Sequence, residues 1–142
     1  MARIVLTNVQ VTVGAVDLSD HVASVTLSTT YDVLETTAFA GGNVPAAAKT
    51  RIAGLADNSV TLEFHQDFAA GEVEATIYPL LGTTAAVAIK PNESAPIGAD
   101  NPAYTFNALI SEWTPLNGAV GELATASVTW PVSGAITKDV TP

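Results

Sequence analysis

The chain has 142 residues, with five Lys or Arg against fourteen Asp or Glu and a formal net charge of −9. It contains no cysteine, which excludes disulfides, thiolate metal sites and cysteine nucleophiles. Nucleic-acid binding needs clustered basic residues to neutralise phosphates, whereas the five here are scattered: Arg3, Lys49, Arg51, Lys90 and Lys138.

The length fits one domain spanning residues 1–142, and such a chain can bury a stable core without staples. The N-terminal segment has one positive charge and a short apolar run, Ile4 to Leu6, which does not fit a signal peptide. No stretch approaches the roughly 18 consecutive apolar residues of a transmembrane helix. We therefore expect a soluble protein that is made in a cytoplasm and has no membrane contact.

Alternating side chains predict strands in the first third of the chain. Val9, Val11 and Val13 alternate with polar residues, and residues 14–17 read as a turn. A second, longer alternation runs from Val25 to Val33. From residue 35 to residue 53 the pattern dissolves into small residues with two glycines and a proline. A connection of that length tends to be functional or mobile.

The run from Gly54 to Phe64 is predicted to be a turn at residues 54–57 followed by a half-buried strand. One face of that strand is polar, with Ser59, Thr61 and Glu63, and the other is apolar. Its core phrase occurs three times in the chain: Ser24-Val25-Thr26-Leu27, Ser59-Val60-Thr61-Leu62 and Ser127-Val128-Thr129-Trp130. The chain is therefore built largely from half-buried strands.

One helix is predicted at about residues 68–78. Val73 and Ile77 are four residues apart, Asp67 is placed to cap the helix, and Gly82 supplies a stop. Strands resume at 85–89, 104–110 and 126–130, separated by loops at 91–102 and from residue 115. The tail, 136–142, is expected to fray or to join a neighbour. The pattern predicts a mainly β fold, an antiparallel β-sandwich or barrel with one flanking helix.

No catalytic apparatus stands out between these elements. His21 follows Asp20, and His65 precedes Asp67 by two positions, but a catalytic or metal site would need a third partner supplied by the fold. An exposed or edge position is the favoured interpretation of His65. Glu72 and Glu74 are interpreted as compensating the helix dipole. We expect no enzyme activity, no cofactor and no metal.

Five segments carry a pattern through their order along the chain: residues 16–22 (Val-Asp-Leu-Ser-Asp-His-Val), 36–39 (Thr-Thr-Ala-Phe), 54–64, 77–82 (Ile-Tyr-Pro-Leu-Leu-Gly) and 101–104 (Asn-Pro-Ala-Tyr). Together and in this order, they resemble the tail tube proteins of long-tailed bacteriophages. The resemblance implies a small β-sandwich or barrel that forms hexameric rings. The rings stack into a channel through which DNA leaves the capsid without being bound specifically.

The same resemblance implies a virion protein of the tail that is assembled in the host cytoplasm. Its expected partners are further copies of itself, a tape-measure protein and a tail-terminator protein. The polar face of Ser59, Thr61 and Glu63 is the candidate channel wall. The segment 35–53, with Phe39, Lys49 and Arg51, is the candidate contact between rings; the alternative is a flexible surface loop.

Two other functions remain open from the sequence. The chain could form a head-tail connector or tail-completion ring of the same tail. It could instead be a β-sandwich module that binds a carbohydrate or receptor through Trp113, Trp130 or the loop at 91–102.

Overall fold

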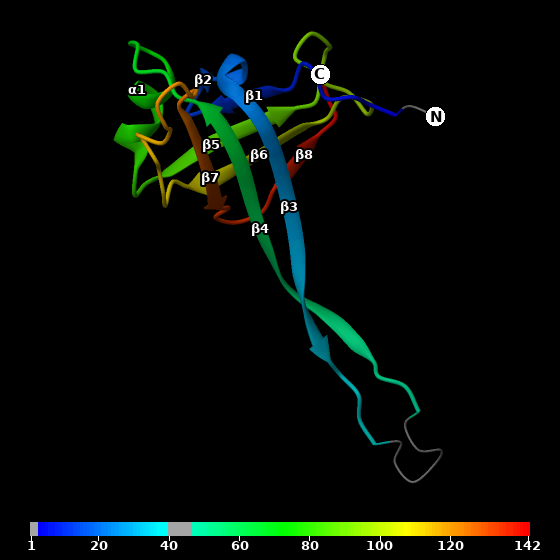
Figure 1. The fold of residues 1–142 in the computed structure, drawn as a ribbon. Coiled ribbons are helices and arrows are strands. Elements are labelled where there is room, and N and C mark those ends of the chain that lie inside the picture. The colour runs from blue at the N-terminus through cyan, green and yellow to red at the C-terminus, as the bar shows by residue number, and fades with distance from the viewer. Residues whose placement is uncertain (1–2, 40–46) are drawn as a thin grey trace.

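The computed structural model describes residues 3–39 and 47–142. Its fold is mainly β, with two antiparallel sheets and one short helix (Figure 1), which confirms the predicted fold class. The elements are β1 (Gln10–Val13), β2 (Val16–Asp17), η1 (Ser19–His21), β3 (Val22–Glu35), β4 (Arg51–His65), α1 (Val73–Ile77), η2 (Tyr78–Leu80), β5 (Thr84–Lys90), β6 (Ala103–Leu109), β7 (Thr125–Pro131) and β8 (Thr137–Asp139).

The larger sheet has five strands in the order β2-β1-β5-β6-β8. The first two strands form a hairpin whose turn holds Gly14 and Ala15, both with positive φ. The turn predicted at residues 14–17 is therefore shorter than expected, because Val16 and Asp17 form β2. The last strand, β8, pairs with β6 through Thr105 and Thr137. The segment after residue 136 was expected to fray or to join a neighbour, but residues 137–139 complete this sheet within the same chain.

The smaller sheet has three strands in the order β3-β4-β7. Its central strand, β4, pairs with β3 along nearly its whole length but with β7 only from Ser59 to His65. Among the residues that the structure describes, residues 51–58 therefore have β3 as their only strand neighbour. At about 3.3 Å per residue, this part of the β3–β4 pair forms a two-stranded ribbon roughly 25 Å long, which leaves the body in Figure 1. We call it the ribbon.

The core lies where the two sheets face each other. Phe64 and Trp130 are fully buried, with ring centroids 6.2 Å apart, and Val11 and Val13 of the other sheet belong to the same cluster. Each such side chain contributes about 1.5–3 kcal/mol of burial free energy. The apolar positions predicted on β4 are Val60, Leu62 and Phe64, and all three are in this core.

The turn predicted at residues 54–57 is wrong. β4 is continuous from Arg51, and β3 extends to Glu35, so the unpatterned stretch 35–53 contracts to residues 36–50. Of these, residues 40–46 lie outside the described residues. Gly54 of β4 lies opposite an irregularity in the register of β3, between Tyr31 and Val33. A glycine within a strand is expected at such a place.

The predicted helix is present but shorter than residues 68–78. α1 covers Val73–Ile77 and continues as the 3₁₀ turn η2, which contains Pro79. Asp67 does not cap it, because the N-cap position is Glu72 and no side-chain cap is formed. Val73 and Ile77 are fully buried, so the predicted apolar stripe holds the helix against the core. No helix among the described residues is long and apolar enough to cross a membrane.

Candidate functional site

The outer face of the three-stranded sheet is polar. Ser59, Thr61 and Glu63 alternate along β4 with residues that are buried in the core, so the three predicted channel-wall residues do share one face. Thr61 is exposed, and Ser59 and Glu63 are half-buried.

Neighbouring strands extend this polar face in register. Thr61 is paired with Thr26 of β3 and with Thr129 of β7, and the hydroxyl oxygens of Thr61 and Thr129 are 3.1 Å apart. Ser24 and Ser127 pair with Glu63 in the same way. The three copies of the Ser-Val-Thr phrase lie on the three strands of one sheet. This repeat was therefore the sequence signal for the surface. We call this surface the hydroxyl face.

The ribbon exposes large apolar side chains to solvent. Tyr31, Val33 and Leu34 of β3 are 50% exposed or more, as are Ile52 and Leu55 of β4. An isolated two-stranded hairpin is at best marginally stable in water, and long exposed apolar edges favour pairing with another chain. The ribbon therefore exposes apolar strand edges of the kind that favour pairing with another chain.

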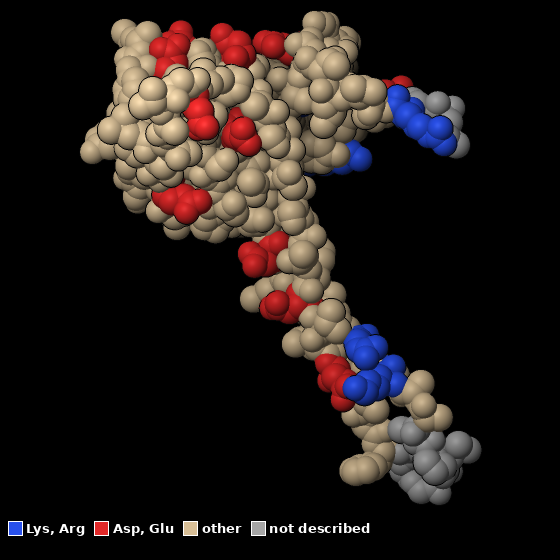
Figure 2. Space-filling view, viewed as in Figure 1, with Lys and Arg blue, Asp and Glu red and all other residues tan. Residues whose placement is uncertain are grey.

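The three predicted contact residues of segment 35–53 lie at or beyond the distal end of the ribbon. Phe39 is fully exposed. Lys49 Nζ lies 3.7 Å from a carboxylate oxygen of Glu35, and Arg51 is the register partner of the same glutamate. Figure 2 shows basic residues gathered near the end of the ribbon, and acidic residues both along the ribbon and over the body.

The two edges of the three-stranded sheet differ. On the β7 edge, the Thr129 N–H donates to Glu112 Oε1 at 2.7 Å, and the Thr125 N–H donates to the Asn117 carbonyl at 3.3 Å. Pro131 has no N–H to offer. The connection between β6 and β7 thus covers the β7 edge. Within the described residues, the opposite edge, along β3, has no strand neighbour.

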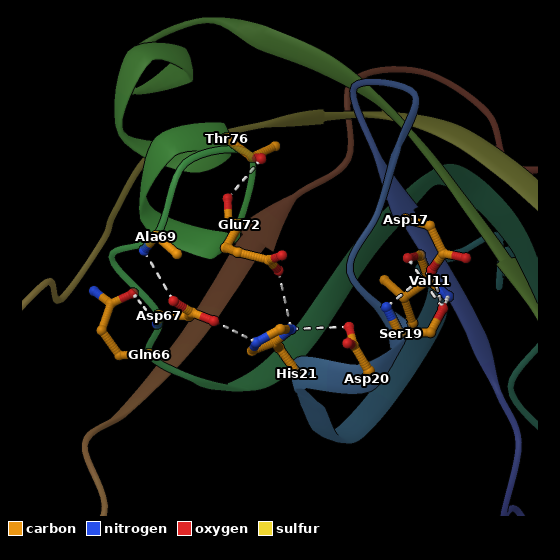
Figure 3. Close-up of polar contacts among 10 residues, drawn as sticks. All are labelled: Val11, Asp17, Ser19, Asp20, His21, Gln66, Asp67, Ala69, Glu72 and Thr76. Carbon is orange, nitrogen blue, oxygen red and sulfur yellow. Dashed lines mark hydrogen bonds and ion pairs between the residues drawn. The ribbon is translucent and has the colours of Figure 1, made fainter.

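A histidine clasp joins the start of β3 to the segment after β4. His21 Nε2 lies 2.9 Å from Asp67, and its Nδ1 lies 2.8 Å from Asp20 and 3.6 Å from Glu72 (Figure 3). Burial lowers the pKa of His21, but hydrogen bonds to Asp20 and Asp67 outweigh it and raise the pKa above its usual value. Asp67 is two positions from His65 in the sequence, but in the fold its carboxylate pairs with His21.

This clasp also supplies the geometry for a cation. Ligand atoms of Asp20, His21 and Glu72 lie within 4.8 Å of one another. A protonated imidazole satisfies the facing carboxylates without an ion, and the raised pKa of His21 favours that state. Asp67 is held in place by the Ala69 N–H at 2.9 Å, and this bond and the His21 contact lower the pKa of Asp67. The cluster therefore acts as an ion-paired staple between two segments.

The two tryptophans that suggested a binding module are structural. Trp130 is fully buried, and its indole N–H donates to the Glu112 carbonyl at 2.9 Å. Trp113 packs edge-on against Phe64 with centroids 5.7 Å apart, and its N–H donates to Glu74 at 2.6 Å. Glu74 thus anchors a tryptophan, a role that the dipole interpretation missed.

The comparisons with known proteins give no family for the chain, since no family model and no curated protein matches it. The surfaces that bear on function are therefore the hydroxyl face, the ribbon and the two unlike sheet edges.

Proposed function

We propose that this chain is a structural subunit of a bacteriophage tail tube, which forms stacked rings around a channel for DNA. The observation that carries the proposal is the ribbon. A pair of strands about 25 Å long that leaves the body with five large apolar side chains exposed is stabilised only when another subunit covers it.

The hydroxyl face supports the channel part of the proposal. Serine and threonine hydroxyls from three strands, with Glu63 as the charged residue among them, offer no positive charge to DNA phosphates. DNA adheres to protein mainly through Lys and Arg. A wall of this kind lets a polyanion slide past without being held.

The first test shortens the ribbon without touching the body. Thr30 and Asp57 are register partners, so residues 31–56 can be replaced by Asn-Gly, which forms a two-residue hairpin turn. We expect a folded subunit that forms no stacked tubes, measured by electron microscopy of concentrated protein. Near-ultraviolet circular dichroism of the buried Trp130 reports whether the body is intact.

A point variant gives the same test in the full-length chain. Leu55 is 80% exposed, so Leu55→Asp places a charge in the proposed contact without disturbing the core. Ala86→Asp, on the exposed face of β5, adds the same charge elsewhere and is the matched control. Tubes formed equally well by Leu55→Asp and by the wild type, or a wild type that forms no rings or tubes under any condition, would contradict the proposal.

A further inference from the structure

An apolar groove opens on the β3 side of the body. It has a volume of about 370 Å³ and lies between β3 and the five-stranded sheet. Its lining includes Leu6, Val9, Val25, Leu27, Tyr104 and Ile136. Because β3 is an edge strand, the groove and an unpaired strand edge lie side by side.

The opposite side of the body carries exposed apolar side chains on the connection between β6 and β7. Leu116, Val120 and Leu123 are 81%, 104% and 63% exposed. The connection is fixed to β7 by the bonds from Thr129 to Glu112 and from Thr125 to Asn117, so these side chains are presented from an anchored segment. We call residues 111–124 the shoulder.

The charges of the two sides are complementary. The shoulder contains Glu112 and Glu122 and no basic residue. The groove is bordered by Lys138, the register partner of the lining residue Tyr104, because cross-strand partners point to the same face of a sheet. Lys90 follows the lining residue Ile89 on β5 and therefore points to the opposite face, and its Nζ donates to the Ala95 carbonyl at 3.0 Å. Together with Arg3 in the N-terminal segment, Lys90 and Lys138 are all the Lys and Arg residues that lie outside the ribbon and its distal end.

We propose that the shoulder of one copy of this chain docks in the groove of the next copy. Leu116, Val120 and Leu123 then cover the groove, and Glu122 lies toward Lys138. This inference rests on the proposed self-assembly and deepens it, because it names the lateral contact within a ring. The contact joins two different surfaces of the same chain, and repetition of such a contact closes a ring when the rotation allows it.

Two exposed positions test the contact from its two sides. Val120→Asp puts a charge on the shoulder, and Leu6→Asp puts one in the groove, where Leu6 is 55% exposed. A buried, unpaired carboxylate opposes association, so we expect each variant to raise the concentration needed for ring formation at least about tenfold. Native mass spectrometry and electron microscopy measure this, with Ala86→Asp as the control of equal charge.

Mixing the two variants tests whether the contact joins unlike surfaces. Val120→Asp keeps an intact groove, and Leu6→Asp keeps an intact shoulder, so the mixture is expected to form mixed pairs that neither variant forms alone. Isotope labelling of one variant identifies these pairs by mass. Mixed pairs that are no more abundant than pairs of either variant alone would overturn the inference.

The outcomes separate this contact from the proposed function. If the wild type forms rings and Val120→Asp forms them equally well, the shoulder contact alone would be overturned. A wild type that stays monomeric under all conditions would overturn both.

Discussion

At the scale of single residues, Gly54 shows why a glycine need not mean a turn. A Cβ added at Gly54 would lie 3.0 Å from Asp32 Cβ and 3.4 Å from the Leu34 side chain. The glycine therefore allows the two strands of the ribbon to approach closely at an irregularity in their register.

Gly54→Val is expected to open the ribbon locally. Overpacking costs about 1–3 kcal/mol, which exceeds the gain of up to about 1 kcal/mol in strand propensity. Hydrogen exchange of ribbon amides should accelerate while the unfolding midpoint of the body stays the same. Gly98→Val is the control, because an added Cβ there meets no atom within 4 Å. Unchanged ribbon exchange in Gly54→Val would contradict this account of the glycine.

His21 is expected to make stability depend on pH. Its pKa is raised in the folded chain by hydrogen bonds to Asp20 and Asp67, which outweigh the effect of burial, and Glu72 faces the same ring. A raised folded pKa contributes stability that is fully present below the unfolded value of about 6.5 and is lost as pH rises through the folded value.

The measurement is urea unfolding of the wild type and His21→Gln at pH 5.5 and at pH 8.5. Glutamine keeps a polar side chain but cannot become an imidazolium. The wild type should exceed the variant in unfolding free energy by more at pH 5.5 than at pH 8.5. The same difference at both values would show that ion pairing in the clasp contributes nothing.

At the scale of elements, the sequence predicts what alternation encodes and misses what only pairing decides. Alternation located the apolar face of β4 and the recurring phrase of the three strands. It could not show that Thr26, Thr61 and Thr129 form one row, because register depends on contacts between segments distant in the chain. The limits of the ribbon were missed for a related reason. Its strands have no buried face to impose a period, so Leu55 and its neighbours read as irregular.

The candidate site was predictable to a similar extent. Ser59, Thr61 and Glu63 followed from local periodicity, whereas the clasp joins His21 to Asp67 across 46 positions and left no local pattern. Nothing in the sequence indicated the role of Glu112 at the β7 edge either. It lies in a connection without periodicity, and its role exists only because the β7 edge needs an acceptor for the Thr129 N–H.

At the scale of the whole molecule, a net charge of −9 does not by itself decide how DNA behaves in a channel. What matters is the charge of the wall, and Thr61 lies at the centre of the hydroxyl face, between Thr26 and Thr129. Thr61→Lys adds one positive charge per subunit to that wall. In the proposed tube, every ring would then carry a circle of lysines that can displace counterions from phosphates.

Tubes of Thr61→Lys assembled in the presence of short duplex DNA are therefore expected to retain DNA that nuclease cannot reach, whereas wild-type tubes retain little. Retention should fall steeply between about 50 and 200 mM salt, because each phosphate contact releases counterions. Thr105→Lys places the same charge on the exposed face of β6, in the other sheet. DNA bound there lies outside the channel and should be digested. Equal protection by both variants, or none by Thr61→Lys, would mean that the hydroxyl face does not line the channel.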